Sequence, residues 1–236
     1  MFSNKHLFVR QNGKLWEHVV TTAGKEVKPG MKNIFGEDGL VYRVTAKAVD
    51  LIVLNLLFLV TCIPVVTIGA AQTALYSVTL KMCRNEESYL VKSYWKYFRA
   101  NLKCGTVAWL ICAVISLVLT ADFLILWGTG SEMGQILQIL VFAVALLAVM
   151  VLSYIFPLTA MFENTVSNTF KNAMIISMTR IVYTIPITVI NLVPVVLLLC
   201  GGKALACGIS VYFMIGFSLG AYLNSFLLRK VFERYI

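Results

Sequence analysis

Charged residues are scarce in this sequence. Asp, Glu, Lys and Arg together make up 13% of its 236 residues, whereas 59% are hydrophobic and the mean hydropathy is +0.84. Soluble domains carry about 25% charged residues. A shortage of this size, combined with long apolar runs, is typical of chains that are solvated by lipid. The composition therefore excludes an ordinary soluble globular protein.

Metal-ligand and catalytic patterns are also missing. The two histidines, His6 and His18, lie in the N-terminal segment. No CxxC pair occurs among the six cysteines, Cys62, Cys83, Cys104, Cys112, Cys200 and Cys207. A zinc or haem site inside the membrane part is therefore not expected, and no P-loop, HExxH or GxSxG motif is present. We expect no enzymatic activity, no cofactor and no metal.

Long apolar runs are what the sequence does contain. They cover residues 48–63, 65–82, 105–127, 135–162, 181–200 and 204–228. Because a spanning helix needs about 20 apolar residues, the first two runs are short. The pattern predicts an all-α, polytopic transmembrane helical bundle of about six passes within residues 41–228. Residues 1–40 form a polar, flexible tail, in which Met31 is an alternative start, and residues 229–236 form a second tail.

Cations indicate the orientation of the bundle. They cluster before the first run and between the second and third, and they recur at Lys171, Arg180 and the C-terminus. Because cytoplasmic loops are enriched in Lys and Arg, both tails are predicted to be cytoplasmic. The second run then either crosses fully or forms a re-entrant hairpin with the first. The net charge of +9 is explained by topology and anionic lipid, so nucleic acid is not an expected partner.

Two amphipathic helices are predicted on the cytoplasmic side. In residues 89–103, cations form one stripe and an apolar stripe lies about a quarter-turn away. The segment is either a positive-inside connection without a partner or a docking helix. A second such helix covers residues 164–178. The candidate partner or lipid contacts are Lys92, Trp95, Lys96, Phe98, Arg99, Lys103, Phe170 and Lys171.

Uncharged amides are the main polar groups within the apolar runs. Asn55, Gln72 and Asn191 are candidate intramembrane polar contacts. Interhelical hydrogen bonds of this kind contribute about 0.6 kcal/mol each on average. If the first two runs form a hairpin, Asn55 and Gln72 face each other.

Two segments carry a family resemblance. Residues 54–81, LNLLFLVTCIPVVTIGAAQTALYSVTLK, together with Glu86, Glu87 and the aromatic-basic helix that follows, resemble the first motif of the YesL family of bacterial membrane proteins. Residues 156–173, FPLTAMFENTVSNTFKNA, are similar to that family's second motif. The resemblance implies a domain of unknown function in the bacterial cell membrane, encoded near carbohydrate ABC importers. It supplies no catalytic residues.

Two functions are therefore open. The first is an accessory or regulatory component of carbohydrate uptake, with membrane lipids and ABC importer permease subunits as partners. The alternative is a small transporter or channel in its own right, which requires a polar cavity lined by Asn55, Gln72 or Asn191.

Overall fold

The computed structural model describes residues 40–86, 89–126, 132–162, 164–200 and 208–232. The predicted N-terminal tail and Met31 lie outside these residues. The chain separates into two units, Met1–Val49 and Asp50–Ile236. The described part of the first unit is the beginning of helix α3, Leu40–Cys62.

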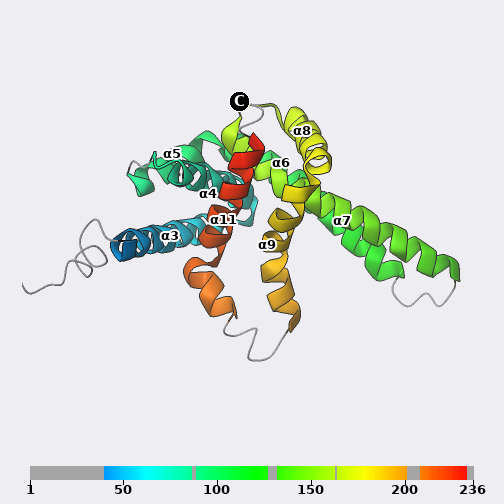
Figure 1. Ribbon diagram of the computed structural model, residues 1–236. Helices are drawn as coiled ribbons and strands as arrows, with labels where there is room; N and C mark the ends of the chain where they lie inside the picture. The colour runs from blue at the N-terminus through cyan, green and yellow to red at the C-terminus, as the bar shows by residue number, and fades with distance from the viewer. Residues whose placement is uncertain (1–39, 87–88, 127–131, 163, 201–207, 233–236) are drawn as a thin grey trace, which may run out of the picture. The chain divides into compact units, whose positions relative to one another are not determined.

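The described residues are almost entirely helical and contain no strand, which confirms the all-α prediction. The elements of the second unit are seen in Figure 1. After α3 they are η1 (Val65–Thr67), α4 (Ile68–Cys83), α5 (Leu90–Ala100), α6 (Leu102–Leu126), α7 (Glu132–Met161), α8 (Val166–Thr179), α9 (Ile181–Cys200), the π-helical turn η2 (Tyr212–Gly216) and α11 (Phe217–Phe232).

Four helices in the described residues are long and apolar enough to cross a membrane. They are Val44–Cys62, Leu102–Leu126, Glu132–Met161 and Gly208–Phe232. The pair Val166–Thr179 and Ile181–Leu197, bent by 110°, is a fifth candidate. The predicted second pass, α4, is not among them: its 16 residues extend about 24 Å at 1.5 Å per residue, less than the apolar core of about 30 Å.

Helix α4 lies at the centre of the core. Of its 16 residues, 13 are buried, and it packs against α5, α6, α7 and α11. Its hydroxyl side chains bond back to the helix: Thr73 Oγ1 donates to the carbonyl of Gly69 at 2.8 Å and Ser77 Oγ to that of Thr73 at 2.9 Å. Protein rather than lipid therefore surrounds this segment, which explains its weak hydropathy.

Two glycines allow α4 and α6 to approach each other closely. A Cβ atom at Gly69 would overlap the carbonyl oxygen of Gly105 and lie 2.5 Å from Cβ of Trp109. A Cβ atom at Gly105 would lie 2.8 Å from Cα of Ala70. Since both positions meet backbone atoms, any larger residue there must separate the helices.

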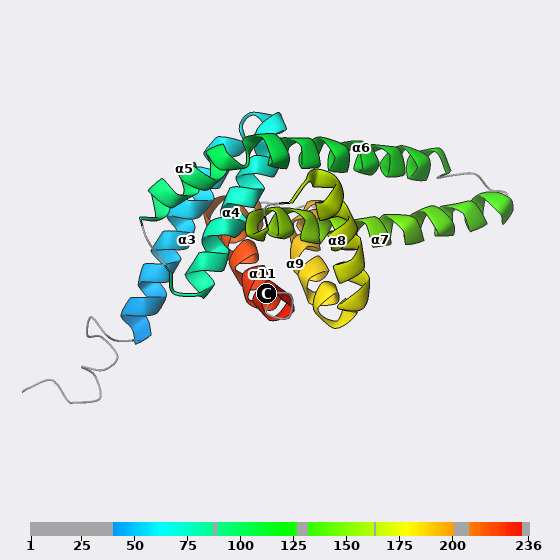
Figure 2. The same ribbon diagram turned by 90° about the horizontal axis from the view of Figure 1, so that it is seen from above.

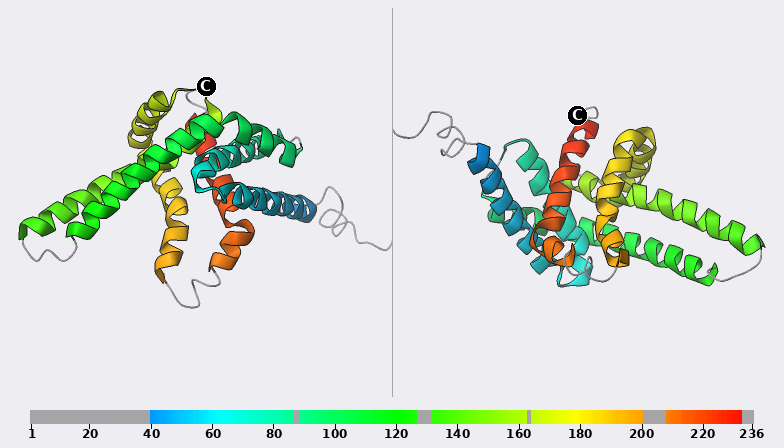
Figure 3. Two further views of the ribbon diagram at one scale, coloured as in Figure 1. Left: turned by 180° about the vertical axis from the view of Figure 1, so that it is seen from behind. Right: turned by 60° about the horizontal axis from the view of Figure 1, so that its bottom comes forward.

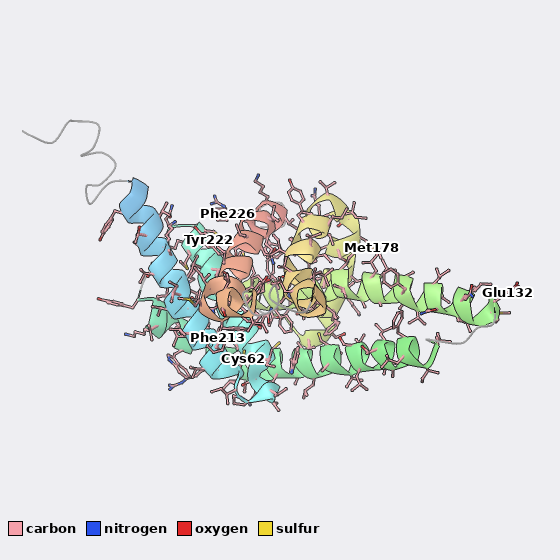
Figure 4. The ribbon with its side chains drawn as sticks, turned by 90° about the horizontal axis from the view of Figure 1, so that it is seen from below. Cys62, Glu132, Met178, Phe213, Tyr222 and Phe226 are labelled. Atoms are coloured by element: carbon pink, nitrogen blue, oxygen red, sulfur yellow. The ribbon has the colours of Figure 1, made fainter. Side chains whose placement is uncertain are left out.

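Helices α6 and α7 run side by side in opposite directions and project away from α4, α5 and α11 (Figures 2 and 3). Glu132 lies at the far tip of this hairpin, away from Cys62, Phe213 and Tyr222 (Figure 4). Many large apolar side chains along the hairpin are exposed, for example Leu117, Ile125 and Ile139. Such surfaces are typical of helices that face lipid.

Candidate functional site

Three uncharged polar side chains meet in the interior where α4, α9 and α11 come together. The amide Nδ2 of Asn224 donates to Oδ1 of Asn191 at 2.8 Å and to the hydroxyl of Tyr76 at 3.3 Å. Asn224 is fully buried and Tyr76 is 2% exposed. Within the described residues, Oδ1 of Asn224 is buried without a hydrogen-bond partner. The cluster thus holds an acceptor whose hydrogen-bonding capacity is unused.

A cavity of about 240 Å³ adjoins this cluster. Its polar lining comes from Gln72, Tyr76, Ser153 and Asn191, and aromatic rings form much of the remaining wall, including Phe58, Phe156, Tyr212 and Phe217. Among the described lining residues there is no carboxylate, amine, guanidinium or imidazole group. The arrangement can therefore offer hydrogen bonds and apolar surface but no full charge.

Asn55 holds one wall of the cavity in place. Its Nδ2 donates to the carbonyls of Phe213 at 2.7 Å and Tyr212 at 3.2 Å, and its Oδ1 accepts from the backbone N–H of Ser218 at 3.1 Å. The π-helical turn leaves carbonyls without their usual helical donors, and Asn55 satisfies two of them. Gly216 is required in this turn because a Cβ atom there would lie 2.5 Å from the Tyr212 ring.

Of the predicted intramembrane amides, Gln72 and Asn191 line the same cavity, while Asn55 binds the π-helical turn beside it and does not pair with Gln72. The sequence candidates did not include Tyr76, Ser153 and Tyr212, nor Asn224, an amide of the last apolar run that forms interhelical hydrogen bonds. Tyr76 follows Gln72 by one helical turn, so the i, i+4 spacing is the one sequence signal that relates these two residues. The partners of Asn224 are far away in the chain, and no local pattern indicates them.

The predicted amphipathic segment forms α5, which is fixed to the core by one buried side chain. Tyr94 is fully buried, and its hydroxyl shares a 2.6 Å hydrogen bond with Thr61. Burial raises the pKa of Tyr94 above its ordinary value, the nearby Cys62 raises it further, and the bond to Thr61 lowers it. The phenol therefore stays protonated at neutral pH.

Cations cover the outer face of α5. The side chains of Lys92, Lys96, Arg99 and the following Lys103 are exposed, and Trp95 is 38% exposed. Phe98, by contrast, is buried, with its ring 5.7 Å from that of Trp95 in an edge-on arrangement. The apolar stripe is thus divided: Phe98 packs inward, whereas Val91 and Trp95 stay exposed. On α8, Phe170 is partly buried and Lys171 is exposed.

A second, smaller cavity of about 140 Å³ lies between α4 and α5. Asp50, Lys81, Glu86 and Ser93 line it, and the ammonium of Lys81 lies 5.0 Å from the centre of the Tyr97 ring. Charged groups of both signs here contrast with the uncharged lining of the larger cavity.

The long apolar helices are those of a helical membrane protein and are compatible with several passes. Residues 51–123 match the model of a family described as a protein of unknown function, DUF624. The match includes α4 and α5 but fewer than half of the 236 residues. No curated protein and no solved structure matches the chain.

Proposed function

We propose that the protein is a non-catalytic, accessory or regulatory component of carbohydrate uptake in the bacterial cell membrane, docking on the permease subunits of an ABC importer through α5. The observation that carries the proposal is the exposed face of α5, where the stripe of Lys92, Lys96 and Arg99 lies beside Trp95. The resemblance to the YesL family supports the carbohydrate context.

The anchoring of α5 favours docking over a passive connection. The buried Tyr94 and its bond to Thr61 attach the helix to the core, so the backbone that carries the cations is already ordered and only their side chains lose freedom on binding. Arg and Trp are enriched where proteins bind one another. The complementary surface is an acidic patch on the cytoplasmic side of a permease subunit, and lipid headgroups compete for the same cations.

The topology that we propose has four crossings and a re-entrant hairpin. Tyr94, on α5, reaches Thr61 at the end of α3, and Gly105, at the start of α6, contacts Gly69. If the cations of α5 lie at the cytoplasmic interface, the turn after Thr61 lies close below that interface, so the hairpin of α3 and α4 is shallow and does not reach the other side. If α3 and α4 form a re-entrant hairpin, the predicted cytoplasmic cations and both tails lie on the same side of the membrane. A bundle of six passes would place them on one side as well.

The docking proposal is tested by charge reversal on α5. The variant Lys92→Glu/Lys96→Glu/Arg99→Glu is compared with wild type for co-purification with permease subunits in mild detergent and for sugar uptake in a deletion strain. We expect loss of both with an unchanged gel-filtration profile. The matched control, Lys14→Glu/Lys25→Glu/Lys28→Glu, introduces the same charge change elsewhere. Purification of the wild type alone, with normal uptake in the deletion strain, would refute the proposal.

A second candidate, a small transporter, is favoured by one observation. The cavity required by this alternative exists, and Gln72 and Asn191 line it. The test is uptake of a radiolabelled solute into proteoliposomes. Flux above that of protein-free liposomes, lost on Asn191→Leu, supports transport, and flux equal to that of empty liposomes excludes it for that solute.

A further inference from the structure

We propose that the larger cavity binds a small uncharged polyol, whose hydroxyl groups are held by Asn191, Tyr76 and Gln72, with Asn224 supporting the first two from behind. This inference names the ligand class for the cavity of the transporter candidate. It does not depend on docking through α5, and it applies whether the protein transports its ligand or senses it.

The polar wall is matched to hydroxyl groups. Amides and phenols each offer both a donor and an acceptor, and so does a hydroxyl group. Asn191 and Tyr76 reach the cavity while both bind Asn224, whose second amide atom, Oδ1, has no partner among the described residues. A buried acceptor left unpaired is unfavourable. A ligand whose binding rearranges Asn191 and Tyr76 would give Oδ1 of Asn224 a hydrogen-bond donor. The contacts within the protein leave this oxygen unpaired.

The absence of charged groups in the described lining selects against ions. A carboxylate or ammonium entering the cavity would lose its hydration and meet no opposite charge. Full charges of both signs lie instead in the smaller cavity beside α5. An uncharged ligand loses less hydration, and the amides replace it.

The aromatic wall and the volume of the larger cavity further restrict which uncharged ligands fit it. Phe58 and Phe217 pack with ring centroids 5.3 Å apart, and Tyr212 meets Phe217 edge-on at 5.4 Å. Such rings contact the C–H face of a polyol while its hydroxyls point to the amides. The volume of about 240 Å³ is below the roughly 300–1,000 Å³ typical of drug-sized ligands, so a molecule with few carbon atoms fits.

The test is equilibrium binding of radiolabelled erythritol to the full-length protein in nanodiscs. We expect saturable binding that unlabelled glycerol and ribitol displace, whereas lactate (charged) and butanol (apolar) at equal concentration do not. Asn191→Leu, which keeps a similar side-chain size, should weaken binding at least tenfold. Tyr76→Phe removes one hydroxyl group and should weaken it several-fold. Asn168→Leu, the same substitution as at Asn191 but on the exposed surface of α8, should bind like wild type.

The outcomes separate the proposals. Absence of saturable binding by the folded wild type, displacement by butanol, or unchanged affinity in Tyr76→Phe overturns the polyol site. If Asn191→Leu does not fold, the affinity of Tyr76→Phe for erythritol decides whether the cavity is a polyol site. Binding without flux in proteoliposomes supports the site and excludes transport, whereas co-purification with a permease without polyol binding supports docking and excludes the site.

Discussion

The contact between Gly69 and Gly105 allows a sharp prediction about stability. In Gly69→Ala the new methyl group overlaps the carbonyl oxygen of Gly105 and lies 2.5 Å from Cβ of Trp109. Neither atom is the end of a flexible side chain, so α4 and α6 must move apart. The matched control is Gly220→Ala, because a Cβ atom there meets its nearest neighbour, Cγ2 of Ile190, at 3.7 Å, an ordinary contact distance.

The comparison of Gly69→Ala with Gly220→Ala isolates the free-energy cost of the steric overlap. Both substitutions replace a helical glycine by alanine, which favours the helix by about 1 kcal/mol in each case. Overpacking a tight core costs about 1–3 kcal/mol. Taking about 2 kcal/mol for the overlap, at about 2–4 °C per kcal/mol for a domain of this size, Gly69→Ala should melt about 4–8 °C below Gly220→Ala.

Thermal unfolding of the detergent-solubilised variants measures this difference. A thiol-reactive dye reports unfolding, because Cys83 and Cys112 are buried in the folded protein. Gly105→Ala should behave like Gly69→Ala, since its methyl group meets the same contact from the other helix. If Gly69→Ala and Gly220→Ala unfold at the same temperature, the close approach of α4 and α6 is wrong.

Further substitutions test the anchor of α5, the π-helical turn and the topology. Tyr94→Phe should lower the free energy of unfolding by about 1 kcal/mol. If this loss comes from the hydrogen bond to Thr61, adding Thr61→Val should lower it little further. Additive effects of the two substitutions in a double-mutant cycle would show that the bond does not stabilise the protein. Asn55→Ala removes three hydrogen bonds, about 2 kcal/mol at 0.6 kcal/mol each, and hydrogen exchange should accelerate in residues 208–218; unchanged exchange there would show that Asn55 does not hold the turn. A membrane-impermeant maleimide should label Glu132→Cys in intact cells but Val65→Cys only after permeabilisation, and labelling of both in intact cells would exclude the re-entrant hairpin.

Hydropathy predicts which segments are helices much better than it predicts which helices pack against one another. The apolar runs correspond to α3, α4, α6, α7, α9 and the final helix. The start of α3 at Leu40, before the predicted 48, escapes a hydropathy criterion because polar residues continue the helix beyond its apolar part. A π-helical turn is equally hidden, because hydropathy does not register which carbonyl each N–H binds.

The candidate site could be predicted only in part. The amides Gln72 and Asn191 stood out in the sequence because polar groups are rare in apolar runs. Their position at one cavity depends on the packing of both α4 and α9 against α11. The residue that connects this cluster, Asn224, lies on α11 and is 148 positions from Tyr76. Helix α5 illustrates the same limit: its cationic stripe is readable, but the burial of Phe98 follows from packing on the core.

The burial of α4 has a consequence for how the protein is made. Its Thr79 hydroxyl lies 2.9 Å from that of Ser225 on α11, so part of its cover is synthesised 146 residues later. Helices α5, α6 and α7 also pack on α4 and are made earlier, so before α11 is made only the face that carries Thr79 lacks its partner. A chain that ends before residue 217 therefore has an incomplete centre.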